Sequence, residues 1–141
     1  MTDLFLIAQV AGRTVAVASA AVASVVDIGE VTPVPRSGAM VVGLAALRSR
    51  VVTVIDCRTA LGLADRTDAR RAVIVTADGH QYAMLVDALE DVLPLPLDPV
   101  DNGLTLDPAW AEIALGVVDR DGEPLLAVDL ARLVPRIAAA A

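Results

Sequence analysis

The sequence contains one pattern of strand-like and turn-like segments twice. Residues 5–26 align with residues 72–93 without a gap, and both segments carry a glycine at the same place. Residues 43–56 align with residues 116–129, again without a gap, and both segments begin with glycine and end with aspartate. Because the two alignments follow each other in the same order, they indicate an internal duplication. A chain with this organisation is expected to fold as two similar units.

Several short segments have the composition of β-strands, since they are rich in Val, Ile and Leu and are bounded by Gly, Pro, Asp or Ser. Asp78-Gly79 and Asp121-Gly122 separate pairs of these segments and are typical of hairpin turns, because both residue types tolerate positive φ. The sequence therefore predicts a mainly β protein with two antiparallel barrels of about five strands that share an apolar seam. The predicted strands are 4–10, 13–18, 41–47, 51–55, 72–76, 81–86, 90–95, 113–118 and 124–128.

Both copies of the second repeated segment end in an aspartate that suits the start of a helix. Asp56 and Asp129 each follow an apolar strand-like run. An aspartate at the N-cap accepts a hydrogen bond from a free amide of the first turn. Gly62 and Pro135 lie where each helical turn is expected to stop. We therefore predict two capped helical turns, and we expect residues 137–141 to continue or fray from the second.

The hydrophobic core has to be built from aliphatic side chains, because 56% of the residues are hydrophobic but only 2% are aromatic. Trp110 ends the segment 98–110, which contains two Asp-Pro pairs and is predicted to be a loop. We expect Trp110 to fill the core between the halves. The length indicates a single domain over residues 1–141. Its approximate halves are residues 13–70, with strand exchange, and residues 71–135.

The sequence offers few groups for catalysis or metal binding. His80, the single histidine, lies in an Asp-Gly turn and is expected to be exposed. Cys57, the single cysteine, cannot form an internal disulfide, which suits a reducing compartment. The neighbouring Asp56 discourages a thiolate, so we interpret Cys57 as an apolar packing residue. One histidine and one cysteine do not make an ordinary metal site. The sequence therefore predicts a binding module that has no catalytic residue, metal or cofactor.

The charge disfavours two classes of partner. The net charge is −7, whereas binding to nucleic acid or to an anionic membrane needs clustered cations. Residues 14–26 form an uncharged run, but it is shorter than the roughly 20 residues that span a bilayer. The N-terminal segment starts with an acid, which argues against a secretory signal. A cytoplasmic protein without direct membrane insertion is expected.

The stretch GLAALRSRVVTVIDCRTALGL at residues 43–63 resembles the signature of the CheW-like domain, GL-x-N-LRG-x-VVPVIDLR-x-x-LGL. Residues 30–44, 73–93 and 116–134 look like other motifs of that family in the same order, so the resemblance covers nearly the whole chain. Ser49 replaces the turn glycine of the signature. We expect the hairpin to survive, because Ser tolerates most turn positions except strongly positive φ. The sequence departs from the family motifs at Ala46, Ser49, Thr53, Cys57 and Ala88.

The resemblance implies two SH3-like, five-stranded β-barrels packed together, with short helical turns. It also implies a non-catalytic adaptor of bacterial chemotaxis that couples methyl-accepting chemoreceptors to the histidine kinase CheA. Its partners would be the regulatory domain of CheA and the cytoplasmic tip of the receptor. Because the chain carries little besides this domain, we expect a free, monomeric adaptor. Two alternatives stay open: a CheW-like adaptor of a motility or developmental two-component pathway, and a small Cys-dependent enzyme.

The resemblance further implies a receptor-binding surface. In the family, the arginine that matches Arg48 lies at a receptor-facing groove between the barrels, near an acid for which Asp27 is the nearest candidate. Val42 and Leu44 complete this set. A guanidinium at the mouth of an apolar groove can orient a helical hairpin through carboxylates or carbonyls. The alternative interpretation of Arg48 is an ordinary solvated turn residue.

A kinase-binding surface is implied on the second barrel. Asp87, Leu89 and Val92 match a family strand that meets the kinase mainly through apolar contacts. For Leu89 and Val92, a role in the core is the alternative. The remaining residues that we single out, Asp56, Gly62, Asp129 and Gly122, are expected to be structural caps and turns.

Overall fold

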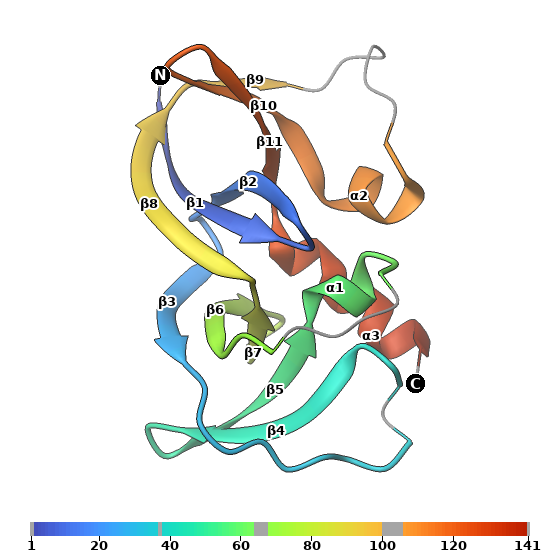
Figure 1. The fold of residues 1–141 in the computed structure, drawn as a ribbon. Coiled ribbons are helices and arrows are strands. Elements are labelled where there is room, and N and C mark those ends of the chain that lie inside the picture. The colour runs from blue at the N-terminus through green and yellow to red at the C-terminus, as the bar shows by residue number, and fades with distance from the viewer. Residues whose placement is uncertain (1, 37, 64–67, 100–105, 141) are drawn as a thin grey trace.

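The structure is a computed structural model that describes residues 2–36, 38–63, 68–99 and 106–140. Within these residues the strands form two sheets, which lie one above the other in Figure 1. One sheet has six strands in the order β8-β1-β2-β11-β10-β9, and the other has five in the order β3-β6-β7-β5-β4. The prediction of a mainly β protein with short helical turns is confirmed.

The six-stranded sheet consists of β1 (Asp3–Val10), β2 (Arg13–Ala18), β8 (Ala88–Leu95), β9 (Leu97–Pro99), β10 (Ala114–Arg120) and β11 (Glu123–Val128). The five-stranded sheet consists of β3 (Val22–Asp27), β4 (Val41–Leu47), β5 (Arg50–Asp56), β6 (Arg71–Ala77) and β7 (His80–Leu85). The helices are α1 (Cys57–Ala60), α2 (Pro108–Ile113), the 3-10 helix η1 (Leu130–Leu133) and α3 (Val134–Ala140). In Figure 1, α1, α2 and α3 all lie on one side of the molecule.

Two strands, β3 and β9, are absent from the sequence-based prediction. β3 contains Ala and Ser and is half-buried, and it becomes a strand because it pairs with β6. β9 has three residues, of which the last is proline, and it pairs with the outer side of β10. Since proline cannot donate to a strand ladder, it is confined to such edges. The six-stranded sheet therefore has one strand more than the five expected.

The duplication holds at the level of individual strand pairs. The β1–β2 hairpin places Phe5 opposite Ala18, and the β6–β7 hairpin places the equivalent Ala72 opposite Leu85. β2 runs parallel to β11, and β7 runs parallel to β5 in the equivalent register. Both repeats also bulge at the same place where β4 pairs with β5 and where β10 pairs with β11. The two units thus have one architecture.

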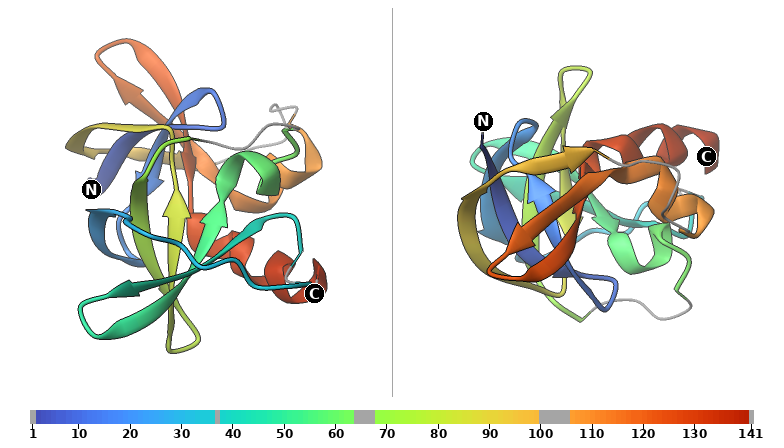
Figure 2. Two further views of the ribbon diagram at one scale, coloured as in Figure 1. Left: turned by 60° about the horizontal axis from the view of Figure 1, so that its bottom comes forward. Right: turned by 90° about the horizontal axis from the view of Figure 1, so that it is seen from above.

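The two repeats exchange strands. β3 follows β2 along the chain but pairs with β6, and β8 follows β7 but pairs with β1. The β4–β5 hairpin joins β7, and the β10–β11 hairpin joins β2. Seen from above, the six-stranded sheet curls so that β8 approaches β10 (Figure 2). Each sheet therefore contains strands from both halves of the sequence, and the boundary near residue 70 separates the repeats but not the sheets.

Alternate side chains of the central strands face different apolar clusters. Phe5 and Ile7 fill the inside of the six-stranded sheet, and Ile74 fills the inside of the five-stranded sheet. Leu6 and Val73 point the other way, into a third cluster between the sheets. This third cluster is the predicted apolar seam, which the helices complete with Trp110, Ile113, Leu130 and Leu133.

Trp110 lies in this seam, as predicted, with 6% of its surface exposed. The guanidinium carbon of Arg13 lies 4.7 Å from the centroid of its ring. The prediction of a loop over residues 98–110 is wrong at both ends, which belong to β9 and α2. Proline is tolerated in the first turn of a helix, so the second Asp-Pro pair starts α2 at Pro108. Residues 100–105 of the expected loop lie outside the described residues.

The predicted caps are present. Asp56 is fully buried and accepts a hydrogen bond from the Arg58 amide (2.9 Å). Asp129 accepts one from the Ala131 amide (3.0 Å). After α1, the Gly62 amide donates to the Thr59 carbonyl and the next amide donates to the Arg58 carbonyl, which is a Schellman motif. Gly62 therefore ends α1, as predicted.

Pro135 does not end the last helix. The 3-10 turn η1 runs directly into α3, in which Pro135 is the second residue. The prediction of a stop fails because proline's missing N–H and fixed φ suit the first turn of a helix. The expected continuation of the tail is confirmed as far as Ala140.

The hairpin at Arg48-Ser49 forms, but in a conformation that the sequence did not predict. The four hairpin turns Ala11-Gly12, Arg48-Ser49, Asp78-Gly79 and Asp121-Gly122 all have positive φ at both residues. Ser49 has φ 70°, the region in which a side chain is disfavoured. In the other three turns a glycine occupies this position, so the Arg48-Ser49 turn alone among the four has side chains at both positions.

We expect Ser49→Gly to stabilise the protein by about 0.5–1 kcal/mol, because it removes the left-handed strain at a small entropic cost in the unfolded state. The matched control is Gly122→Ser at the equivalent position, where an added Cβ meets no atom within 4 Å. This control should destabilise by a similar amount. Urea titration measures both free energies of unfolding. Free-energy changes of the same sign in the two variants would contradict the explanation.

Candidate functional site

An apolar groove of about 650 Å³ lies between the five-stranded sheet and the C-terminal helices. Leu44, Thr53 and Tyr82 are cross-strand neighbours on β4, β5 and β7, and they form one side of the groove. Ala131, Val134, Pro135 and Ile137 of η1 and α3 form the other side. Leu44 stays 37% exposed although it belongs to an apolar run. A groove beside an edge strand with these walls can take the apolar face of another protein segment.

The local sequence explains both walls. β4 is the outer strand of its sheet, and a bulge between Val41 and Gly43 turns Val41 and Leu44 to the groove side. Gly43 is required there, because a Cβ on this residue would overlap the carbonyl oxygen of Thr32. On α3, Val134 and Ile137 are three residues apart and therefore share one helix face.

A smaller hollow of about 250 Å³ lies on the other side of the β4–β5 hairpin. Its lining comes from β3, from the hairpin and from β7. Arg48 and Arg50 line it on either side of Ser49, and Gln81 of β7 faces it while the neighbouring Tyr82 faces the apolar groove. The two hollows therefore flank the same hairpin.

The structure does not gather the four predicted receptor-binding residues in one hollow. Leu44 lines the apolar groove, and Arg48 lines the smaller hollow. Val42 packs against the interior of the five-stranded sheet and lines a third hollow together with Glu30 and Arg70. Asp27 forms an ion pair with Arg71 (3.2 Å) at the edge of the sheet.

Asp87, one of the predicted kinase-binding residues, ties three elements together. Its Oδ2 accepts a hydrogen bond from the Gly12 amide (2.9 Å) in the β1–β2 turn. The same oxygen accepts one from Arg58 Nη1 (3.2 Å) of α1. The side chains of Asp87 and Arg58 are only 20% and 21% exposed, so this contact is largely shielded from water. Asp87 thus joins the turn, the helix and the start of β8.

The other two residues of that set differ in burial. Leu89 is half-buried and packs against the seam, whereas Val92 is 46% exposed on the outer strand β8. Leu4 on the neighbouring strand β1 is also 48% exposed. Val92 lies opposite Leu6, and Leu4 lies two residues before Leu6 on the same strand. Because side chains two residues apart on a strand point to the same face, the two exposed side chains lie on one face of the sheet. Ala88, which replaces the family's glycine, begins β8.

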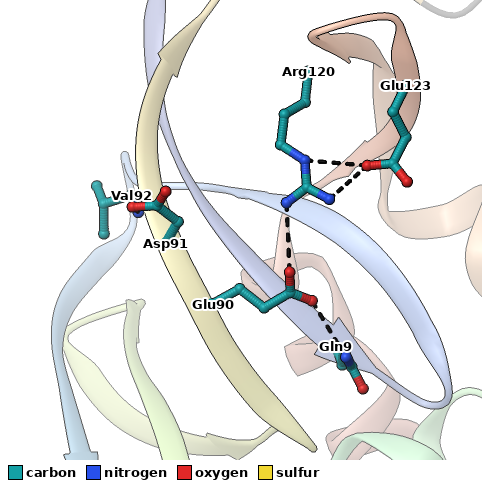
Figure 3. Close-up of polar contacts among 6 residues, drawn as sticks. All are labelled: Gln9, Glu90, Asp91, Val92, Arg120 and Glu123. Atoms are coloured by element: carbon teal, nitrogen blue, oxygen red, sulfur yellow. Dashed lines mark hydrogen bonds and ion pairs between the residues drawn. The ribbon is translucent and has the colours of Figure 1, made fainter.

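A polar network that the sequence did not reveal connects β8 to the β10–β11 hairpin (Figure 3). Arg120 donates hydrogen bonds to Glu90 and to Glu123, and Glu90 also accepts one from Gln9 (3.3 Å). The hydrogen bond to Glu123 is the main cause that raises the pKa of Arg120. Nearby, the Val92 amide donates to Asp91 (2.8 Å). The network links the outer strand β8 to the far side of its sheet.

Cys57 is buried in the seam at the start of α1. Burial, followed by the charges of Asp56 and Asp87, raises the pKa of its thiol. A thiol in this environment stays protonated at neutral pH and is a poor nucleophile. This is the apolar packing role expected from the sequence.

The described part of the chain contains no group of three or more His, Cys, Asp or Glu side chains that could hold a metal ion. His80 is exposed, as predicted, and lies at the rim of the apolar groove beside Asp78. None of the described helices is both long enough and apolar enough to cross a bilayer. The features with which these residues can recognise a ligand are therefore the hollows and the exposed apolar faces.

A family model described as the CheW-like domain matches residues 4–138. The chain belongs to the CheW-like domain family. Over 114 residues it is 25% identical to a protein of Thermotoga maritima named "Chemotaxis protein CheW", and this alignment covers 80% of the chain and 75% of that relative. The crystal structure of the scaffolding protein TtCheW from Thermoanaerobacter tengcongensis matches with a TM-score of 0.80 at 22% identity. It covers 94% of this chain and 92% of that one.

Membership in the CheW-like family confirms the resemblance seen in the sequence. The likeness to TtCheW confirms the predicted pair of barrels, because it extends over nearly the whole of both chains. The CheW-like family is one of non-catalytic adaptors. The Cys57 thiol is buried in the seam and does not line the apolar groove.

Sequence reasoning missed the groove wall formed by α3 and the residues around Arg48. The spacing of Val134 and Ile137 indicates an amphipathic turn, but nothing in the sequence places it opposite Tyr82. Likewise, Gln81 and Arg50 line one hollow only because β7 and β5 pair in parallel. Long-range pairing of this kind leaves no local signal.

Asp87→Asn is expected to lower the free energy of unfolding by about 1–3 kcal/mol, because it weakens the contact to Arg58 in a largely shielded site. Asp91→Asn is the matched control, since Asp91 accepts its hydrogen bond from the next amide on an exposed strand. The control should change stability by less than about 0.5 kcal/mol. Chemical denaturation compares the two variants. A fully stable Asp87→Asn protein would contradict the structural role.

The Cys57 thiol is expected to resist a thiol-specific reagent in the native protein and to react fully after unfolding in guanidinium chloride. The reason is burial, which keeps the thiol protonated and inaccessible. Absorbance of the released chromophore measures both rates. Fast labelling of the native protein would instead revive the alternative of a Cys-dependent enzyme.

Proposed function

We propose that this chain is a cytoplasmic, non-catalytic adaptor of chemotaxis signalling that couples chemoreceptors to the histidine kinase CheA. The observation that carries the proposal is the match of the CheW-like family model to residues 4–138. A relative named as a chemotaxis protein and a likeness to a scaffolding protein support it. The described residues also form an apolar groove that can bind a partner, and the thiol of Cys57 is buried.

An adaptor needs two separate surfaces so that it can hold two partners at once. In our proposal the apolar groove takes the helical tip of the receptor, with Leu44 and Tyr82 in contact with it. The groove lies on the five-stranded sheet and measures about 650 Å³, which gives room for several side chains of a helix. Of the receptor-binding set implied by the family, the proposal retains Leu44, because it lines the groove, and Arg48, because its hollow flanks the same hairpin. It leaves out Asp27, which is engaged by Arg71, and Val42, which packs against the interior of the five-stranded sheet.

The second surface is the exposed apolar face of β1 and β8, which in our proposal meets the regulatory domain of CheA. Val92 and Leu4 are about half exposed there and lie on one face of paired strands. This face belongs to the six-stranded sheet, whereas the groove belongs to the other sheet. Occupation of one surface therefore leaves the other accessible. Asp87 acts in this proposal by fixing the start of β8 and not by contacting the kinase.

Leu44→Arg is expected to weaken binding of a receptor tip fragment at least tenfold, because it puts an unpaired charge into an apolar groove. It should leave binding to the CheA regulatory domain within twofold of the unmodified protein. Val92→Arg should have the opposite pattern, so each variant controls for the folding of the other. Isothermal titration calorimetry measures both affinities.

If the unmodified protein binds neither the receptor tip nor the CheA regulatory domain, the proposed function is wrong. If it binds both and the two variants behave alike, the adaptor role stands but the assignment of the two surfaces fails.

A further inference from the structure

The outer strand β8 is held by a backbone ladder on one side only. Within the described residues it pairs with β1, and no ladder joins it to β10, although the curled sheet brings the two strands close together (Figure 2). The ladders that lead from β8 through β1, β2 and β11 to β10 therefore leave one gap, which lies between β8 and β10. A strand that is held on one side opens more easily than a strand that is held on both.

Side chains bridge this gap (Figure 3). Arg120 of β10 donates through Nη1 to Glu90 of β8 (3.5 Å) and through Nε to Glu123, its cross-strand neighbour on β11 (3.1 Å). Gln9 of β1 donates to the other carboxylate oxygen of Glu90 (3.3 Å). The side chain of Arg120 is only 25% exposed, so water screens its contacts in part. One run of polar contacts thus connects β11, β10, β8 and β1.

A β-bulge directs Glu90 toward this gap. The ladder between β1 and β8 shifts by one residue, and Glu90 is the extra residue that has no Cα partner on β1. A bulge bends its strand and can redirect a side chain. In Figure 3 the side chain of Glu90 points from β8 toward Arg120, whereas Val92 lies on the other side of the strand. β8 therefore has a polar side that contacts the β10–β11 hairpin and an outer side that stays open to a partner.

The other repeat shows that the fold itself does not need this network. The strand equivalent to β8 is β3, which has the same bulge where it pairs with β6, and the extra residue there is Ala23. Leu47 occupies the position equivalent to Arg120, and Arg50 occupies the position equivalent to Glu123. Ala23, Leu47 and Arg50 line the hollow of about 250 Å³. A gap that stays open in the five-stranded sheet is therefore bridged by charged side chains in the six-stranded sheet.

We propose that Arg120 is a positioning residue that holds β8 against the β10–β11 hairpin through Glu90 and thereby preorganises the outer face of β8 for the CheA regulatory domain. Val92 lies on this face, two residues after Glu90, so a movement of β8 away from β10 displaces it. A preformed face avoids the entropic cost of ordering the strand when the partner binds. This inference rests on the proposed function for the identity of the partner but not for the closure of β8.

The first experiment needs no partner and follows amide hydrogen exchange by NMR in the unmodified protein, in Arg120→Leu and in Glu90→Ala. Both variants are expected to fold, because they introduce the residues of the first repeat at equivalent positions. The amides of residues 89–93 should exchange three- to tenfold faster, whereas those of β6 and β7 should change less than twofold. Arg71→Leu is the matched control, because its ion pair with Asp27 joins two strands that a ladder already holds. It should leave exchange in β8 unchanged.

The second experiment measures the affinity for the CheA regulatory domain by calorimetry at 50 mM salt. Arg120→Leu and Glu90→Ala should each bind three- to tenfold more weakly, and the double variant should bind no more weakly than either, since both changes break one contact. At 500 mM salt the unmodified protein should approach the variants, because salt screens the ion pair. Affinity for a chemoreceptor tip fragment should stay within twofold throughout, whereas a general loss of structure would lower both affinities.

If the unmodified protein does not bind the regulatory domain but β8 exchanges faster in both variants, the proposed function fails and the closure of β8 by Arg120 stands. Three results would overturn the inference. The first is weaker binding with unchanged exchange in β8, which would assign Arg120 to direct contact with the kinase. The second is an additive loss of affinity in the double variant. The third is equally faster exchange in all strands, which would show a general loss of stability.

Discussion

The apolar seam between the two sheets is the contact on which the rest of the structure depends. Each sheet contains strands from both repeats, because β3 and β8 exchange partners and the second hairpins pair in parallel with β2 and β7. Neither repeat can complete its own sheet alone. Its apolar strands therefore find all their pairing partners and are buried only when both repeats fold together. The alternating strands supply the seam from both sides, and Trp110, Ile113, Leu130 and Leu133 cover it. One cooperative unit is the physical consequence.

Polar contacts hold the helix α1, the turns and the strand β8 in place at the periphery of this unit. The buried carboxylate of Asp56 starts α1, and Asp87 holds α1 and the β1–β2 turn against the start of β8. Arg120 connects β8 to the opposite hairpin through Glu90 and Glu123. The contacts of Asp87 and the pair of Arg120 with Glu90 link segments that are far apart in sequence, and they add directional contacts to a core that is otherwise aliphatic. A rigid frame of this kind suits an adaptor, because binding to preformed surfaces avoids the entropic cost of ordering them.

The asymmetry between the repeats is where the binding features lie. The duplicated strands have equivalent registers, and Gly43 and Gly116 make the same close approach to a neighbouring backbone. Among the described residues, the differences include a basic turn without glycine in the first repeat and the helix α3 at the end of the second. α3 and the sheet that contains the basic turn frame the apolar groove, whereas the basic turn lines the smaller hollow. The two repeats share one architecture, but sequence differences at equivalent positions give the molecule different binding surfaces on its two sheets.

The sequence by itself determined the duplication, most strands, the Asp56 and Asp129 caps, the stop at Gly62 and the placement of Trp110 and Cys57 in the core. All of these follow from local patterns: alternation, turn residues and capping groups. Only the tertiary structure decided the strands β3 and β9, the helix through Pro135, the wall that α3 gives to the groove and the internal role of Asp87. It also placed Leu44, Arg48 and Val42 in three different hollows and Asp27 in an ion pair with Arg71. These features depend on which edge or surface a segment meets, and that is set by pairing between residues far apart in the sequence, about which a local pattern carries no information.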